Sequence, residues 1–194
     1  KANERLSILS AEAPMSSPVL TDGTAFFQLQ EEFRAAFENT VIDMPRSMLI
    51  AYPHLMNDVN IAVVTTQLTL ASARDSIRVL AWLKQNAPQC KVLVVANNVQ
   101  PAVVEISRKD FESTIERKID LLLPADPKSL AQAAKLGQPV VEAIRGSKLS
   151  TGIISLAEIV AGSFADMADA APSDAKSTSK KNVFASFKSM LKTK

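Results

Sequence analysis

Short apolar runs recur along the chain and are separated by segments with a helical period. Three of these runs are rich in valine and isoleucine with little polar alternation, which favours strands that are buried on both faces. The five runs are Leu6–Leu9, Thr40–Asp43, Ile61–Thr65, Lys91–Ala96 and Ile119–Leu123. We therefore predict a strand at each of them.

The segments between the runs carry apolar stripes that would lie on one side of a helix. The first stripe comprises Phe26, Phe27, Leu29, Phe33, Ala36 and Phe37. The segment from about 71 to 86 carries a second stripe, formed by Ile77, Leu80, Ala81 and Leu83. A third helix, predicted from about 152 to 168, has a stripe of Ile153, Leu156, Ile159, Val160 and Phe164. Strands that alternate with helices of about 10 to 15 residues predict an α/β fold, with right-handed βαβ units and a mostly parallel sheet covered by helices on both faces.

The composition changes after residue 168. Residues 169–180 are small and polar and include a proline, so we predict a flexible linker there. Residues 181–194 form a separate short element that is rich in lysine. The predicted organisation is an α/β domain at 1–168, a linker at 169–180 and a basic C-terminal helix at 181–194.

Composition narrows the class of protein. Of the 194 residues, 47% are hydrophobic and 22% are charged, as in an ordinary globular domain, and the net charge of +2 is too small to favour nucleic-acid binding by the whole chain. The single cysteine, Cys90, and the single histidine, His54, argue against a disulfide framework and a protein-built zinc site. No apolar run is long enough to span a bilayer, and no signal peptide opens the sequence, so we expect a cytoplasmic protein. Because the first residue is lysine, we also expect the sequence to belong to a longer chain.

Candidate chemistry lies where a predicted strand ends, because ligands bind an open parallel sheet at the carboxyl ends of its strands. Asp43 ends the apolar run Thr40–Asp43, where a carboxylate is costly to bury unless a cation or hydrogen-bond donors compensate it. One interpretation is the aspartate that helps to hold Mg²⁺ in P-loop ATPases, usually through water. The other is an aspartate that caps the following helix or turn, and the local pattern leaves both open.

Several motifs, taken in sequence order, resemble those of one ATPase family. Phe37–Arg46 resembles the F-D-x-V-hydrophobic-D-x-P-R segment of pilus-assembly ATPase-like proteins (CpaE/TadZ), a branch of the MinD/ParA family of deviant-Walker ATPases. Later segments resemble the family's A-D-x-x-hydrophobic-V-T-T strand, L-A-S-x-R-D helix start, V-hydrophobic-N-R strand end and I-P-x-D … A-x-x-x-G-x-P stretch. These segments are Asp58–Thr66, Leu70–Asp75, Val94–Val99, Leu123–Pro127 and Ala134–Val140. The resemblance covers about residues 5–165.

The resemblance implies a P-loop NTPase fold with ATP and Mg²⁺ as cofactors. It implies that Asn97 contacts the adenine and that Asp43 holds Mg²⁺ through water. The residues that it places at the nucleotide are Asp43, Pro45, Arg46, Asn97, Pro124 and Asp126. It further implies a homodimer whose partners are pilus or secretion assembly proteins, peripheral on the inner membrane and often at a cell pole.

The family's phosphate-binding loop, a K-G-G-x-G-x-T sequence after the first strand, does not occur in these 194 residues. The five glycines are not clustered, and Asn98 stands where the family usually has arginine. Phosphate binding needs successive backbone N–H groups at a helix N-terminus and a lysine near the phosphates. We therefore expect ATP hydrolysis only if such a loop lies upstream of Lys1. The strand before the loop is normally central in the sheet, so its absence is expected to leave unpaired edges unless an upstream segment, a partner or another strand order covers them.

The segment Lys181–Lys194 has the pattern of a basic amphipathic helix. Its apolar face consists of Val183, Phe184, Phe187, Met190 and Leu191, and its lysines include Lys181, Lys188 and Lys192. This pattern suits a helix in an anionic membrane interface, and the C-terminal end of MinD proteins resembles it. Docking into a partner's groove, packing on the chain's own domain and a disordered basic tail remain open alternatives.

Taken together, the sequence favours an ATPase-like positioning or assembly protein of a type IV (Tad/Flp) pilus or a related secretion machine. It would act through nucleotide-linked dimerisation and through docking on a membrane or partner. The alternatives are an active MinD/ParA-type ATPase in spatial partitioning and a nucleotide-free pseudo-ATPase scaffold. A partition-type ATPase acting on DNA is disfavoured, because Asp43-Met44-Pro45-Arg46 matches the pilus branch.

Overall fold

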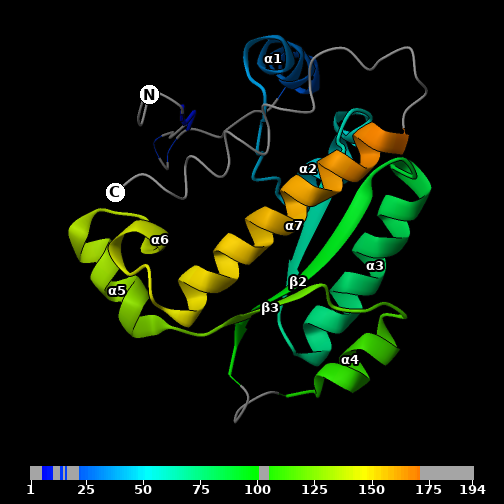
Figure 1. The fold of residues 1–194 in the computed structure, drawn as a ribbon. Helices are drawn as coiled ribbons and strands as arrows, with labels where there is room; N and C mark the ends of the chain where they lie inside the picture. Colours follow the sequence, from blue (N-terminus) through cyan, green and yellow to red (C-terminus); the bar gives the residue numbers. More distant parts are fainter. Residues whose placement is uncertain (1–5, 11–13, 15, 17–21, 101–104, 171–194) are drawn as a thin grey trace. The chain divides into compact units, whose positions relative to one another are not determined.

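The structure, a computed structural model, describes residues 6–10, 14, 16, 22–100 and 105–170 (Figure 1). The chain divides into two units, Lys1–Leu55 and Met56–Lys194, and each unit is described by itself. The predicted linker reaches from residue 169 into a range, 171–180, that lies outside the described residues, and so does the predicted helix at 181–194. The core of the fold lies in the second unit.

A three-stranded parallel sheet organises the second unit. Its strands are β1 (Ile61–Thr66), β2 (Lys91–Val99) and β3 (Leu121–Pro124), arranged in the order β1-β2-β3. Ile61 lies opposite Lys91 in the first ladder, and Val95 lies opposite Leu121 in the second. The central strand β2 therefore has a hydrogen-bonded neighbour on both sides, which confirms the predicted parallel α/β arrangement.

Helices connect the strands and follow the last one (Figure 1). They are α3 (Leu70–Asn86), α4 (Arg108–Thr114), α5 (Pro127–Leu136), α6 (Val140–Ala143) and α7 (Lys148–Ala170). Side-chain oxygens of Thr69, Ser107 and Asp126 accept backbone N–H groups at the starts of α3, α4 and α5, satisfying donors that a helix leaves unpaired. The helices predicted near 71–86 and 152–168 are thus confirmed, with the second one beginning four residues earlier.

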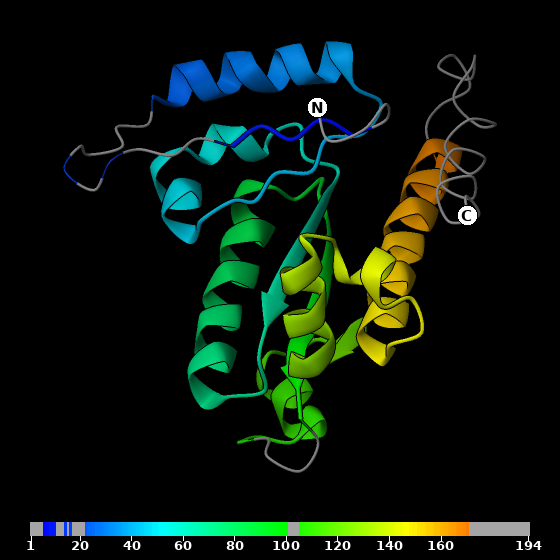
Figure 2. The same ribbon diagram turned by 90° about the vertical axis from the view of Figure 1, so that its left-hand side faces the viewer.

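Two apolar layers cover the two faces of the sheet. Val94 and Ala96 of β2 pack with Phe111 of α4 on one face, and the whole layer is Leu68, Ala73, Val94, Ala96, Phe111, Ile115 and Ile119. Val95 points to the other face, where the layer is Val95, Leu123, Ala133, Val140 and Leu149. Figure 2 shows α3 and α7 on opposite sides of the strands. Alternate residues of β2 thus serve opposite cores, as the period of a strand requires.

Gly152 sets the distance between α7 and the sheet. A Cβ atom at this position would lie 2.8 Å from the Leu123 Cδ2 atom of β3, which is closer than side chains tolerate. A Cβ atom here would require the Leu123 side chain to shift, while the nearest backbone atom, the Leu122 carbonyl oxygen, lies 4.0 Å away.

The first unit contains α1 (Gly23–Ala36), α2 (Arg46–Ala51) and the start of a short 3-10 helix, η1 (Pro53–Met56). Asp22 caps α1, and the Tyr52 ring packs where a Cβ atom on Gly23 would sit. Among the described residues of this unit, only Gly23 and Leu55 are buried. The predicted first helix is confirmed, but this unit has little core of its own.

Two predicted strands are not formed. Leu6–Leu9 and Thr40–Asp43 have no strand structure, and Val41 is 98% exposed. A β-strand exists only with a ladder partner, and no described residue pairs with either run. The apolar pattern of Thr40–Asp43 therefore led to the prediction of a buried strand. It carried no information about whether a neighbouring strand would be present to pair with it.

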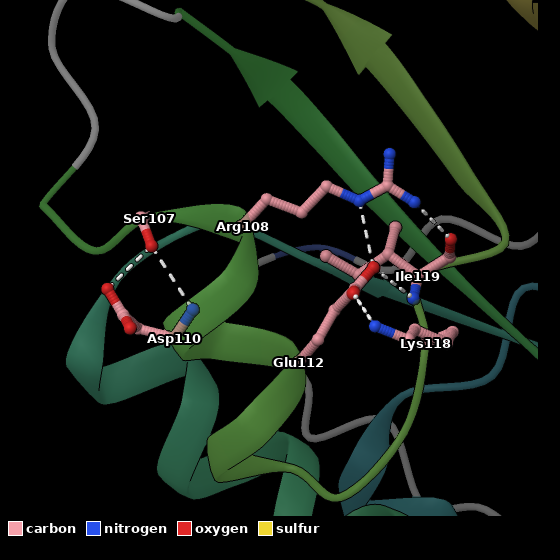
Figure 3. Close-up of polar contacts among 6 residues, drawn as sticks. All are labelled: Ser107, Arg108, Asp110, Glu112, Lys118 and Ile119. Carbon is pink, nitrogen blue, oxygen red and sulfur yellow. Dashed lines mark hydrogen bonds and ion pairs between the residues drawn. The ribbon is translucent and has the colours of Figure 1, made fainter.

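Glu112, near the end of α4, ties this helix to the segment that precedes β3 (Figure 3). Its Oε1 atom accepts the Arg108 Nε–H at 2.8 Å and the Ile119 backbone N–H at 3.0 Å, and its Oε2 atom lies 2.8 Å from the Lys118 Nζ atom. These donors, Lys118 first and then Arg108 and Ile119, lower the pKa of Glu112 from 4.5 to about 2. The side chain is buried, so its negative charge depends on these partners.

We predict that Glu112→Gln destabilises the protein at pH 7 and that the deficit shrinks as pH falls. A carboxyl group with a lowered pKa contributes stability above its unfolded pKa, and this contribution is lost between pH 4.5 and about 2. Urea unfolding of both proteins at pH 7, 4 and 2.5 would measure the change. Glu158→Gln, on an exposed residue of α7, is the control and should have little effect. A Glu112→Gln deficit that is equal at all three pH values would contradict the prediction.

Candidate nucleotide-facing edge of the sheet

The carboxyl ends of the three strands gather polar residues at one edge of the sheet. β1 ends at Thr66, β2 carries Asn97 and Asn98 near its end, and β3 ends at Pro124 just before Asp126. Ligands of open parallel sheets bind at this edge. The ladder places Val99 opposite Pro124, so the structure brings together the segments that hold Asn97, Pro124 and Asp126.

The end of β2 is irregular at Asn97 and Asn98. The register with β3 shifts between Ala96 and Val99, and Asn98 has a φ of 56°, in the left-handed region. The Asn98 backbone N–H donates to the Asn97 Oδ1 atom at 2.8 Å. Among the described residues, the Asn97 amide group donates no hydrogen bond, and both side chains are exposed. The Asn97 Nδ2 group is therefore a free donor at the strand edge within the described residues. The hydrogen bond that the Asn97 Oδ1 atom accepts holds the side chain in place.

Asp126 is committed to the start of α5. Its Oδ1 atom accepts the Ser129 backbone N–H at 3.0 Å. Hydrogen bonds from the Ser129 hydroxyl, the Ser129 N–H and the Ser147 hydroxyl lower the pKa of Asp126, while its partial burial opposes them. The carboxylate is thus the N-cap of α5, and this structural role accounts for it without any ligand.

A hydroxyl pair at the end of β1 was not predicted from the sequence. The Thr66 and Ser76 Oγ atoms lie 3.0 Å apart, and both side chains are buried. This bond joins the end of β1 to α3. The only signal for it in the sequence is that Ser76 falls on the same side of α3 as the buried Ala73 and Leu83.

The remaining predicted nucleotide residues lie in the first unit. Asp43 is exposed in an extended segment, Pro45 precedes α2 and provides no side-chain cap, and Arg46 is the first residue of α2. These three residues belong to a different unit from Asn97 and Asp126, so each set is described by itself. Within the part of the chain that the structure describes, no group of three histidine, cysteine, aspartate or glutamate residues could hold a metal ion. The assignment of Mg²⁺ to Asp43 stays a prediction.

The exposed hydrogen-bond donor at this edge is the side-chain amide of Asn97. Asn97 offers an amide donor of the kind that reads a ring nitrogen. A phosphate site would need a row of backbone N–H groups, often at glycines, and Gly137 is the one glycine with positive φ among the described residues. It lies at the end of α5 and not at a strand end.

Among the described helices, none has a long, apolar segment of the kind that spans a membrane.

The sequence matches no protein-family profile and no curated protein. Among solved structures it is similar to a ParA family ATPase from Chlorobium tepidum TLS, with a TM-score of 0.62, 19% identity and coverage of 71% of this chain and 59% of that chain. The fold is that of the ParA and MinD ATPases.

Two MinD structures support the same fold. The cell division ATPase MinD of Pyrococcus furiosus has a TM-score of 0.59 and 21% identity, over 72% of this chain and 58% of that chain. The septum site-determining protein MinD of Pyrococcus horikoshii OT3, complexed with Mg-ADP, has a TM-score of 0.59 and 19% identity, over 72% of this chain and 56% of that chain. The chain therefore spans less than two thirds of the length of these ATPases.

We predict that Asn98→Val lowers the free energy of unfolding by about 1–2 kcal/mol, because a β-branched residue is strained at positive φ. Asn98→Gly should leave stability within about 0.5 kcal/mol of the parent, because glycine adopts this conformation freely. Urea unfolding of the three proteins would measure the difference. Equal stabilities of the valine and glycine variants would show that residue 98 is not held in the left-handed region.

Proposed function

We propose that the chain is part of a MinD/ParA-type ATPase-like protein that positions or assembles a type IV (Tad/Flp) pilus or a related secretion machine. The observation that carries the proposal is the parallel β1-β2-β3 sheet, in a fold similar to those of ParA and MinD structures, with Asn97 and Asp126 at its carboxyl edge. The pilus branch rests on the motif Asp43-Met44-Pro45-Arg46. The motif residues lie at the start of α2, exposed or half-buried.

We propose that this chain binds the base of the nucleotide. The MinD protein of P. horikoshii is complexed with Mg-ADP, which supports ATP or ADP with Mg²⁺ as the cofactors. Asn97 would donate to the adenine, and Asp43 would hold Mg²⁺ through water. The nucleotide, when bound, would supply the switch between monomer and homodimer. Hydrolysis would also require a phosphate-binding loop, and these 194 residues contain none.

One edge of β1 pairs with no described strand. This edge supports the proposal that residues outside these 194 supply the phosphate-binding loop. Within the described part of the chain, β1 pairs only with β2, and Val63 is 39% exposed. The strand Ile61-Ala62-Val63-Val64-Thr65-Thr66 has none of the lysines, prolines or bulges that protect natural edges. We infer that a further strand pairs with it in the assembled protein. Without this strand the protein would act as a nucleotide-free scaffold.

The location proposed for the protein is cytoplasmic and peripheral on the inner membrane, often at a cell pole. The support is the basic amphipathic pattern of 181–194, which suits an anionic lipid surface. One such helix binds marginally, and two in a homodimer would bind far more tightly through avidity. This location therefore depends on dimerisation.

We predict that adenosine shifts the backbone amide signals of Asn97, Asn98 and Ala125 in two-dimensional NMR spectra of the 194-residue chain. Binding is expected to be weak, about millimolar, because no phosphate contacts contribute. Asn97→Ala should weaken it by about fivefold, through the loss of about 1 kcal/mol from one hydrogen bond. Gln132→Ala, at an exposed carboxamide on α5, is the control. Shifts elsewhere but none at these three amides would contradict a base site at this edge.

We predict that deletion of the coding sequence in the organism of origin abolishes type IV pili or scatters their positions on the cell. Electron microscopy of single cells would count the pili and record where they emerge. Asp43→Ala should reproduce part of the defect, and Glu158→Ala, on an exposed residue of α7, should not. Normal number and position of pili in the deletion strain would refute the assembly role, whatever the outcome at the adenosine site.

A further inference from the structure

A hollow of about 400 Å³ lies on the outer side of α4 and the segment that follows it. Its lining consists of Lys109, Glu112, Ser113, Glu116, Arg117 and Lys118. Arg117 and Lys118 precede β3, and the Arg117 guanidinium donates to the carbonyl of Val92, the second residue of β2. The hollow thus lies toward the amino ends of these strands, whereas Asn97 and Asp126 mark their carboxyl ends.

Two cations of the hollow are held in place by the fold. Lys118 is 83% exposed, yet its ammonium is held by Glu112, which is itself fixed by Arg108 and the Ile119 N–H (Figure 3). Arg117 is held by a main-chain carbonyl of the central strand. A ligand that met these groups would have little side-chain motion to freeze, which removes a usual cost of binding to surface lysines and arginines.

The positive charge of the hollow exceeds its negative charge. Both oxygens of Glu112 are engaged, and this carboxylate neutralises part of the charge of Arg108 and Lys118. Arg117 pairs with no carboxylate, and Lys109 makes no hydrogen bond or ion pair among the described residues. Ser113 adds a hydroxyl group with no partner in the same part of the chain. These groups are free to meet the oxygens of an anionic ligand.

Glu116 distinguishes this hollow from a site for a simple anion. It lines the same wall, and its φ of 53° holds it in the left-handed region, where non-glycine residues are strained. A lone phosphate ion would be repelled by its carboxylate. A peptide segment has both kinds of group, because its acidic side chains suit Lys109 and Arg117 and its backbone N–H groups suit the carboxylate of Glu116.

We propose that this α4 surface, formed by Lys109, Ser113, Glu116, Arg117 and Lys118, binds an acidic peptide segment of a partner protein. Side-chain carboxylates of the partner meet Lys109 and Arg117, and a backbone N–H donates to Glu116. The Lys118–Glu112–Arg108 network keeps the wall in place. The proposal does not rest on nucleotide binding, since the surface and the adenosine-facing edge share no residue.

Fluorescence anisotropy of the 194-residue chain with a fluorescein-labelled peptide, Gly-Asp-Glu-Asp-Glu-Gly, would test the proposal. We expect saturable binding that weakens as salt rises from about 20 to 200 mM, because exposed charge pairs are screened. Lys109→Ala should weaken binding about fivefold or more. Lys128→Ala, at an exposed lysine of α5, removes the same charge elsewhere and should have no such effect.

Three results would overturn the proposal. The first is equal weakening by Lys109→Ala and Lys128→Ala, which would indicate attraction by net charge alone. The second is equal binding of the neutral peptide Gly-Asn-Gln-Asn-Gln-Gly. The third is complete displacement of the acidic peptide by 10 mM inorganic phosphate at constant ionic strength, which would indicate a simple anion site. Thermal melting of each variant would confirm that it folds, and Lys109 is suited to this because it has no partner to lose among the described residues.

Discussion

The central position of β2 is the constraint on which the rest of this fold depends. It is hydrogen-bonded on both edges, and Val94, Val95 and Ala96 are fully buried because helices cover both faces. A strand in that position can be neither charged nor irregular along its middle. Its irregularity is confined to Asn97 and Asn98, where the pairing with β3 shifts and polar side chains emerge. The candidate site therefore begins at Asn97, where β2 is no longer buried on both faces and regularly paired with β3.

The same constraint explains what the sequence could predict. Ile61–Thr65 and Lys91–Ala96 were predicted as strands and are strands, because their apolar character follows from burial within the second unit. Thr40–Asp43 has the same character but no ladder partner among the described residues, so it remains extended and exposed. A hydrophobic pattern encodes which side chains need burial, and it is silent about whether a neighbouring strand is present. Because no strand forms at Thr40–Asp43, Asp43 does not lie at a strand end as predicted.

Features that depend on tertiary contacts were out of reach of the sequence. Nothing in the local pattern relates Glu112 to Lys118 and to the Ile119 N–H, since their meeting depends on how α4 turns back toward β3. Asparagine adopts the left-handed region more often than most non-glycine residues, but nothing in the pattern around Asn98 indicated that this residue would do so. By contrast, the capping role of Asp126 follows from a familiar local sequence, Asp126-Pro127-Lys128-Ser129, in which an aspartate precedes a proline at the first helical position.

β2 also connects the two ends of the second unit. The carbonyl of its second residue, Val92, accepts a hydrogen bond from Arg117 of the α4 surface, and Asn97 lies near its other end, at the edge where we propose that the nucleotide base binds. Coupling between two sites requires an element with two discrete arrangements. A strand that is paired on both edges and packed on both faces has no second arrangement of comparable free energy, because sliding by one residue would exchange its two cores. Binding at the α4 surface and at the nucleotide edge should therefore be energetically independent within this unit. Any coupling between the two would therefore have to act through an element outside the sheet.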